Sequence, residues 1–124
     1  MSDRTEPFEM RILLAFEKKH TTHMDSVRTA ILRNGTDAEM VVIEPGALEE
    51  ETERFDPHLV VCEGAIPERA DGQVPARIEL SIESAQPSRF RVGQQRWESL
   101  NPGLAELMAV VADAQRLLGS SSPN

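Results

Sequence analysis

Acidic and imidazole side chains directly follow apolar segments of this 124-residue chain. Glu17 follows the first apolar segment, and Glu63 follows a later one that ends at Cys62. His20 and His23 come at three-residue intervals after Glu17, so the string reads Glu-x-x-His-x-x-His. Carboxylate oxygens and imidazole nitrogens are suitable zinc ligands, and carboxylates also serve magnesium. These side chains are therefore the first to consider as a functional site.

The spacing of Glu17, His20 and His23 is not sufficient to predict a metal site. The string spans a loop and the start of an expected helix, so nothing places the three side chains on one face. No further His or Cys lies near enough in the sequence to complete a tetrahedral zinc site. We therefore expect no metal and no cofactor, and these three residues are the candidate ligands if a metal binds.

No complete catalytic motif accompanies these residues. The sequence contains no Gly-x-Gly-x-x-Gly after its first apolar segment, no Gly-rich phosphate loop with a Lys, and no Gly-x-Ser-x-Gly. Cys62 ends an apolar segment and has no basic cluster beside it, so we interpret it as part of the core. The sequence therefore predicts no catalytic residue, and whether the protein is an enzyme stays open at this point.

The charge balance limits the partners. Thirteen Lys and Arg against 21 Asp and Glu give a net charge of −8, which opposes binding to nucleic acid and to anionic lipid. Arg89, Arg91 and Arg96 lie close together, but only Trp97 beside them could stack on a base. No apolar run approaches the roughly 20 residues of a membrane span, and a single Cys suits a reducing compartment. We expect a cytoplasmic protein that binds neither nucleic acid nor membranes.

The first half of the chain alternates buried strands with helices. Continuous apolar runs predict strands at residues 11–16, 39–43 and 59–62, of a length typical of strands covered on both faces. Apolar residues at helical spacing predict a helix over 22–34, and a short acidic helix is expected at 47–55. Strands and helices in this order form right-handed crossovers onto a parallel sheet. We therefore predict a parallel β-α-β-α-β core.

The second half has a different pattern. Residues 64–76 are interrupted by Gly and Pro, which predicts a loop. Alternation of apolar and polar residues then predicts strands before and after the turn Gly93-Gln94. We expect an antiparallel meander over 76–99, with one face packed and the other in water. A C-terminal helix is expected over 102–118, with Asn101 as its N-cap and Pro102 at its first position.

Three segments of the first half resemble a known family. Phe16-Glu17 stands where that family usually has two adjacent acids, and residues 56–63 resemble the stretch that ends in its phosphoacceptor Asp. Ile66-Pro67 stands where the family often has a hydrophobic residue followed by Pro. Residues 10–67 thus resemble the receiver domains of bacterial response regulators.

The resemblance implies a flavodoxin-like arrangement with a pocket at the strand ends. Glu63 stands at the acceptor position, Glu17 at a metal-binding acid, and Ser81 where the family has a hydroxyl residue after its fourth strand. The chain also departs from the family, because Glu63 is one methylene longer than Asp and Phe16 replaces the second acid. The family's late Lys is absent, since both lysines stand beside the first strand. We therefore expect a receiver-like fold without phosphotransfer.

These features predict a single α/β domain over residues 1–124, with its core at 10–118 and flexible ends at 1–9 and 119–124. A complete receiver has five helices, whereas three are expected here, so part of the apolar sheet surface should lack a helix. A second copy or another protein would then cover it. The leading hypothesis is a non-catalytic, receiver-like regulatory or protein-interaction domain in signalling, forming a homodimer. The alternative is a small flavodoxin-like ligand- or metal-binding protein or enzyme that uses the carboxyl ends of the strands near Glu17, Glu63 and His20.

Overall fold

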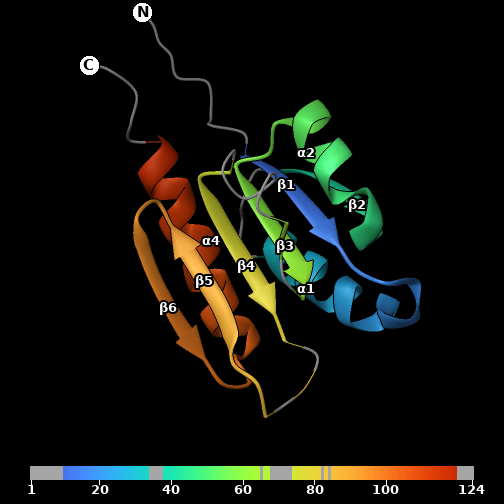
Figure 1. Cartoon of the computed structure of the whole chain (residues 1–124). Helices are drawn as coiled ribbons and strands as arrows, with labels where there is room; N and C mark the ends of the chain where they lie inside the picture. The colour runs from blue at the N-terminus through green and yellow to red at the C-terminus, as the bar shows by residue number, and fades with distance from the viewer. Residues whose placement is uncertain are drawn as a thin grey trace, which may run out of the picture.

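A six-stranded mixed sheet with three α-helices makes up the described part of the chain (Figure 1). The computed structural model describes residues 10–33, 38–64, 66–67, 74–81, 83 and 85–119. The strands are β1 (Met10–Ala15), β2 (Ala38–Ile43), β3 (Leu59–Glu63), β4 (Ala76–Leu80), β5 (Ser88–Val92) and β6 (Gln95–Ser99). The helices are α1 (Thr21–Arg33), α2 (Leu48–Phe55) and α4 (Leu104–Gly119), with 3₁₀ turns η1 (Lys18–His20) and η2 (Pro45–Ala47). The strand order is β2-β1-β3-β4-β5-β6.

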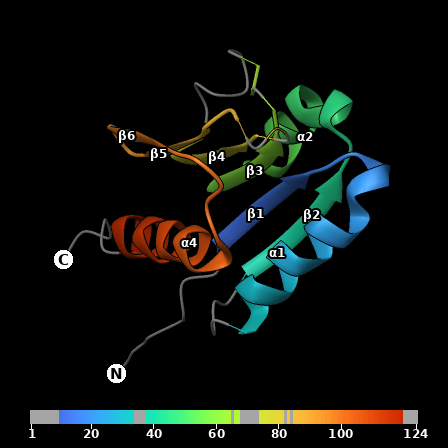
Figure 2. The ribbon, with the colours of Figure 1, turned by 90° about the horizontal axis from the view of Figure 1, so that it is seen from below.

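The first three strands form the predicted parallel core. β1 pairs in parallel with β2 on one side and with β3 on the other, so the chain crosses over from β1 through α1 to β2 and then through α2 to β3. The two crossover helices lie on opposite faces of the sheet (Figure 2). All five residues of β3 are buried, as expected for a strand covered on both faces. The prediction of a parallel β-α-β-α-β core is therefore confirmed.

The predicted antiparallel meander is also confirmed. β4 pairs with β5 and β5 with β6 in antiparallel register, for example Ile78 opposite Phe90 and Phe90 opposite Trp97. Gly93 starts the β5–β6 turn at φ +61°, a conformation that Gly adopts without the steric cost of a side chain. β4 additionally pairs in parallel with β3, so it belongs to both parts of the sheet.

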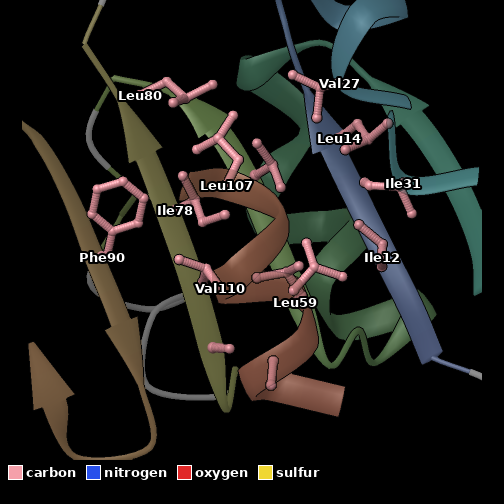
Figure 3. Close-up of a cluster of buried hydrophobic side chains, with 14 of the residues drawn as sticks. Ile12, Leu14, Val27, Ile31, Leu59, Ile78, Leu80, Phe90, Leu107 and Val110 are labelled. Carbon is pink, nitrogen blue, oxygen red and sulfur yellow. The ribbon is translucent and has the colours of Figure 1, made fainter. Parts of the chain in front are cut away.

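Two apolar clusters hold the layers together. On one face, α1 and α4 pack side by side over side chains from β1, β3, β4 and β5, including Ile12, Leu14, Leu59, Ile78 and Phe90 (Figure 3). On the other face, α2 contributes Leu48 to a smaller cluster with Leu13, Val60 and Cys62. Burial of these side chains is the main source of stability, because each removes a large apolar area from water.

One sequence-based expectation about the sheet is wrong. The part of the sheet that carries no helix is the face of β4–β6 opposite α4, and no helix in the described ranges packs on it (Figures 1 and 2). The side chains on this side of the strands are charged rather than apolar: Arg77, Glu79, Arg89, Arg91, Arg96 and Glu98. Those of Arg77 and Glu79 on β4 are largely buried, so the open part of this face belongs to β5 and β6. Period-two alternation sends every apolar residue of these strands to the α4 side, so the uncovered face is polar. As far as the described residues go, this face of β4–β6 does not provide the expected apolar patch.

The helix starts differ slightly from the predicted ones. α1 begins at Thr21, directly after η1, and α4 begins at Leu104 rather than at Pro102. Asn101 has φ +47°, a left-handed conformation that does not continue an α-helix. Of the predicted flexible ends at 1–9 and 119–124, only Gly119 lies within the described residues, and it belongs to α4. Among the described helices, none is both long and apolar enough to cross a bilayer.

Candidate functional site

The carboxyl ends of β1 and β3 lie side by side at one edge of the sheet. Ala15, the last residue of β1, is paired with Cys62, so Glu63 stands beside the point where the chain leaves β1. The chain crosses to β2 on one side of β1 and later to β3 on the other side. This reversal of strand order is the topological switch point at which open α/β sheets usually bind their ligands.

The carboxylate of Glu63 is buried and held at two sides. Only 4% of its side chain is exposed. The backbone N–H of Glu17 donates a hydrogen bond of 3.0 Å to its Oε1. The Nδ1 atom of His20 lies 2.9 Å from Oε1 and 2.8 Å from Oε2. A buried carboxylate needs such partners. Without them, its desolvation would raise the free energy of the folded state by on the order of several kcal/mol.

The 3₁₀ turn η1 brings the imidazole of His20 into place. The backbone N–H of His20 donates a 2.9 Å hydrogen bond to the carbonyl of Glu17, which folds the chain back directly after β1. Residues three apart in a 3₁₀ turn eclipse one another, so Glu17 and His20 share one side of the turn. The Oε1 atom of Glu17 lies 3.9 Å from Nδ1 of His20. One donor atom each from Glu17, His20 and Glu63 lies within 4.8 Å of the other two.

Two lysines lie beside this cluster, and one of them contacts it through Glu17. Lys19 Nζ lies 3.5 Å from Glu17 Oε1, and Lys18 Nζ lies 3.6 Å from Glu44 Oε2. Both lysine side chains are largely exposed. The open hollows that Glu17 borders are lined by Lys18, Glu44 and their neighbours rather than by Glu63 and His20.

Comparison of the sequence with protein-family models gave no match, and comparisons with curated proteins and with solved structures gave none either. The chemistry of the chain is therefore inferred from its own residues.

Two of the candidate residues named from sequence lie apart from the cluster. His23 is exposed, and its ring meets the edge of Phe16 at a centroid distance of 5.6 Å. The hydroxyl of Ser81 donates to the carbonyl of Glu83 at 2.8 Å and accepts from the N–H of the same residue at 3.2 Å. Ser81 thus belongs to a local turn, and it lines a separate hollow with Gly64. The structure brings Glu17 and Glu63 together and adds His20 to them.

Cys62 contributes no nucleophile at this edge. Burial raises the pKa of its thiol to about 12, and the nearby charges of Glu79 and Glu63 act in the same direction. The thiolate form is therefore scarce at neutral pH, which leaves the residue chemically inert. This agrees with its interpretation as a core residue.

Glu79 is a buried carboxylate whose environment the sequence did not reveal. Its Oε2 accepts a 2.6 Å hydrogen bond from the backbone N–H of Ile66 and lies 3.9 Å from Nη1 of Arg77. The alternating pattern of β4 predicted that this face meets water, which is wrong at Glu79. Ile66 and Val74, on either side of the β3–β4 connection, are buried in the α2-side cluster. Glu79 therefore ties the start of this connection to the sheet.

Proposed function

We propose that the chain is a non-catalytic, receiver-like regulatory domain that acts through protein contacts and does not carry phosphate. The strand order β2-β1-β3, with α1 and α2 on opposite faces, supports a flavodoxin-like arrangement for residues 10–67. The antiparallel β5 and β6 depart from a fully parallel sheet, so the likeness is to the first half alone.

The state of Glu63 is the observation that carries this proposal. In-line transfer needs a carboxylate oxygen that can approach the phosphorus atom freely. Both oxygens of Glu63 instead face Nδ1 of His20, and Oε1 also accepts the N–H of Glu17. With 4% of the side chain exposed, an incoming phosphoryl donor has little access to it.

The positive groups of the chain also argue against phosphoryl transfer to Glu63. Phosphoryl transfer depends on positive groups that stabilise the charge of the transferred group. The only lysines of the chain are Lys18 and Lys19, and their ammonium groups pair with Glu44 and Glu17. No Lys is left to meet a phosphoryl group on Glu63.

The partner is proposed to be a protein, either a second copy or another chain, in a bacterial cytoplasm. The homodimer stays a prediction. An apolar sheet face without a helix was the reason to expect it, but the described side chains of β4–β6 opposite α4 are charged. The exposed large apolar side chains among the described residues are spread over four elements or loops: Leu32, Val42, Leu100, Leu104 and Leu117. Scattered exposed apolar residues are ordinary in monomers, so they do not favour one particular contact surface.

Incubation with acetyl phosphate and Mg²⁺, followed by intact-protein mass spectrometry, tests the proposal. We expect no phosphoryl adduct on the wild-type chain, and none on Glu63→Asp, because shortening the acceptor does not supply the missing cation. Glu98→Gln, which changes an exposed carboxylate, serves as a matched control for background labelling. An adduct on the wild type that disappears in Glu63→Gln would overturn the proposal.

A further inference from the structure

We infer that Glu17, His20 and Glu63 form a binding site for a divalent transition-metal ion of the zinc class. Each of the three residues offers one donor atom within 4.8 Å of the other two. The inference goes beyond the proposed function and does not depend on it, because binding an ion requires no phosphoryl transfer. It also differs from the set suggested by spacing alone, since Glu63 takes the place of His23.

The distances suit a small ion with short bonds. Zinc binds imidazole nitrogen and carboxylate oxygen at about 2.0–2.2 Å, so two ligands of a tetrahedral ion stand roughly 3.4 Å apart. Nδ1 of His20 lies 2.8 Å from Oε2 of Glu63 and 3.9 Å from Oε1 of Glu17. Both separations differ from the tetrahedral value by about half an ångström. The donor oxygens of Glu17 and Glu63 lie within 4.8 Å of each other, so an ion also requires these two to come closer together. The half-exposed side chain of Glu17 is the one with room for this movement.

Glu63 is held in an orientation that leaves one oxygen for an ion. Its Oε1 accepts the backbone N–H of Glu17, and Oε2 makes its contact with His20 only, as far as the described residues show. Hydrogen bonds of this kind from outside the ligand set orient metal-binding carboxylates and raise affinity. The backbone of η1 does the same for His20, because its N–H is bonded to the carbonyl of Glu17.

The donor set selects the class of metal. Imidazole suits zinc and its neighbours, whereas magnesium prefers six oxygen ligands in octahedral geometry. Two carboxylates and one imidazole give three protein ligands, so a fourth position stays open for water. Glu17 is 47% exposed and His20 is 26% exposed, which gives an ion a path from solvent to the buried Glu63.

The competing explanation is that His20 and Glu63 form a hydrogen-bonded pair that only stabilises the fold. The two explanations differ in what they require of Glu17. A structural pair needs the backbone N–H of Glu17 but not its half-exposed carboxylate, whose nearest cation is the exposed Lys19. A metal site needs that carboxylate as a ligand. Glu17→Gln therefore separates the two, because it keeps the backbone and the size of the side chain.

Isothermal titration of the full, tag-free chain with Zn²⁺ tests the inference. We expect one ion per chain, and a loss of affinity of about tenfold or more in Glu17→Gln and in His20→Gln. His23→Gln is the matched control, since His23 neighbours the cluster but contacts Phe16 instead. Mg²⁺ at the same concentrations should give no saturable heat.

The midpoint of thermal unfolding provides a second test of zinc binding. A ligand that binds only the folded state raises this midpoint, so Zn²⁺ should raise it in the wild type and in His23→Gln but not in Glu17→Gln. The test is made at Glu17, because its half-exposed side chain can be changed without removing the buried carboxylate of Glu63. Absence of Zn²⁺ binding, or equal affinity in the wild type and Glu17→Gln, would overturn the inference. Neither result bears on labelling by acetyl phosphate, so the two proposals fail separately.

Discussion

Consecutive residues are both buried in β1, whereas in β5 one is buried and the next is exposed. Leu13 and Leu14 face opposite sides of the sheet, and both are fully buried, one beside α2 and the other beside α1. Arg89 and Phe90 also face opposite sides, but only Phe90 is buried, whereas 61% of the Arg89 side chain is exposed. The sheet is thus covered on two faces at β1 and on one face at β5.

The difference follows from how the strands are connected. Each parallel connection must carry the chain back along the sheet, and the helix used for this covers a face. The β5–β6 turn needs no helix, so α4 alone covers the meander on one side. Parallel strands also align their carboxyl ends at one edge, which explains why Glu17, His20 and Glu63 meet in that half.

The largest expected effects come from truncating buried side chains on both faces of β1. We expect Leu13→Ala and Leu14→Ala each to lower the free energy of unfolding by about 2–5 kcal/mol, because each leaves a cavity in a packed cluster. In β5, Phe90→Ala should cost about 3–5 kcal/mol, while Arg89→Ala should stay within about 0.5 kcal/mol. Urea denaturation of the four variants measures this.

The contrast between β1 and β5 is contradicted if Arg89→Ala lowers the free energy of unfolding as much as Leu13→Ala does. That result would mean that the charged face of the meander is covered in solution. A small effect of Leu13→Ala would instead mean that α2 packs loosely on the parallel half.

An intermediate effect is expected at Glu79, the buried charge in the strand shared by both halves. Glu79→Ala removes the acceptor of the Ile66 N–H, and leaving a buried donor unsatisfied costs about 1–3 kcal/mol. Glu98→Ala is the control, since Glu98 is exposed on β6 and makes one loose ion pair with Arg89 at 3.7 Å. The same denaturation experiment compares the two, and equal losses would contradict the structural role of Glu79.

The smallest effect is a pH dependence at the amino end of the parallel half. The backbone N–H of Arg11 donates to Nδ1 of His58 at 2.9 Å. Burial, and next the charge of Arg11, lower the pKa of His58 below its ordinary value of 6.5, although Asp56 acts in the opposite direction. The folded chain therefore binds a proton here less readily than the unfolded chain does. This contribution to stability is present above the unfolded pKa and is lost as the pH falls below it.

Urea denaturation between about pH 7.5 and about pH 5 measures this loss across the range in which His titrates. His58→Gln should flatten the decline in stability on acidification, whereas the exposed His23→Gln should not. An unchanged decline in His58→Gln would show that other groups are responsible.

The strands and crossovers were predictable because they depend on local patterns. A continuous apolar run, as in β1 and β3, indicates a strand covered on both faces. Alternation, as in β5, indicates a strand covered on one face. The nearness of Glu17 and Glu63 was predictable too, because residues that follow neighbouring parallel strands share an edge.

His20 was expected near these strand ends in the alternative function, but its direct contact with Glu63 was not predicted. Its spacing from Glu17 grouped it with His23, while η1 turns it toward Glu63, which lies 43 residues away in the chain. A 3₁₀ turn has no strong sequence pattern, so the direction of the imidazole could not be predicted.

Local residue patterns, then, determined the type, order and buried faces of nearly every element, because burial of alternate or successive side chains is a property of short segments. Contacts between distant segments decided the rest. They placed an imidazole on Glu63, buried Glu79 beneath the start of the β3–β4 connection, and left charge rather than apolar surface on the open face. Such contacts depend on the packing of the whole chain, since only the folded chain brings these groups within bonding distance.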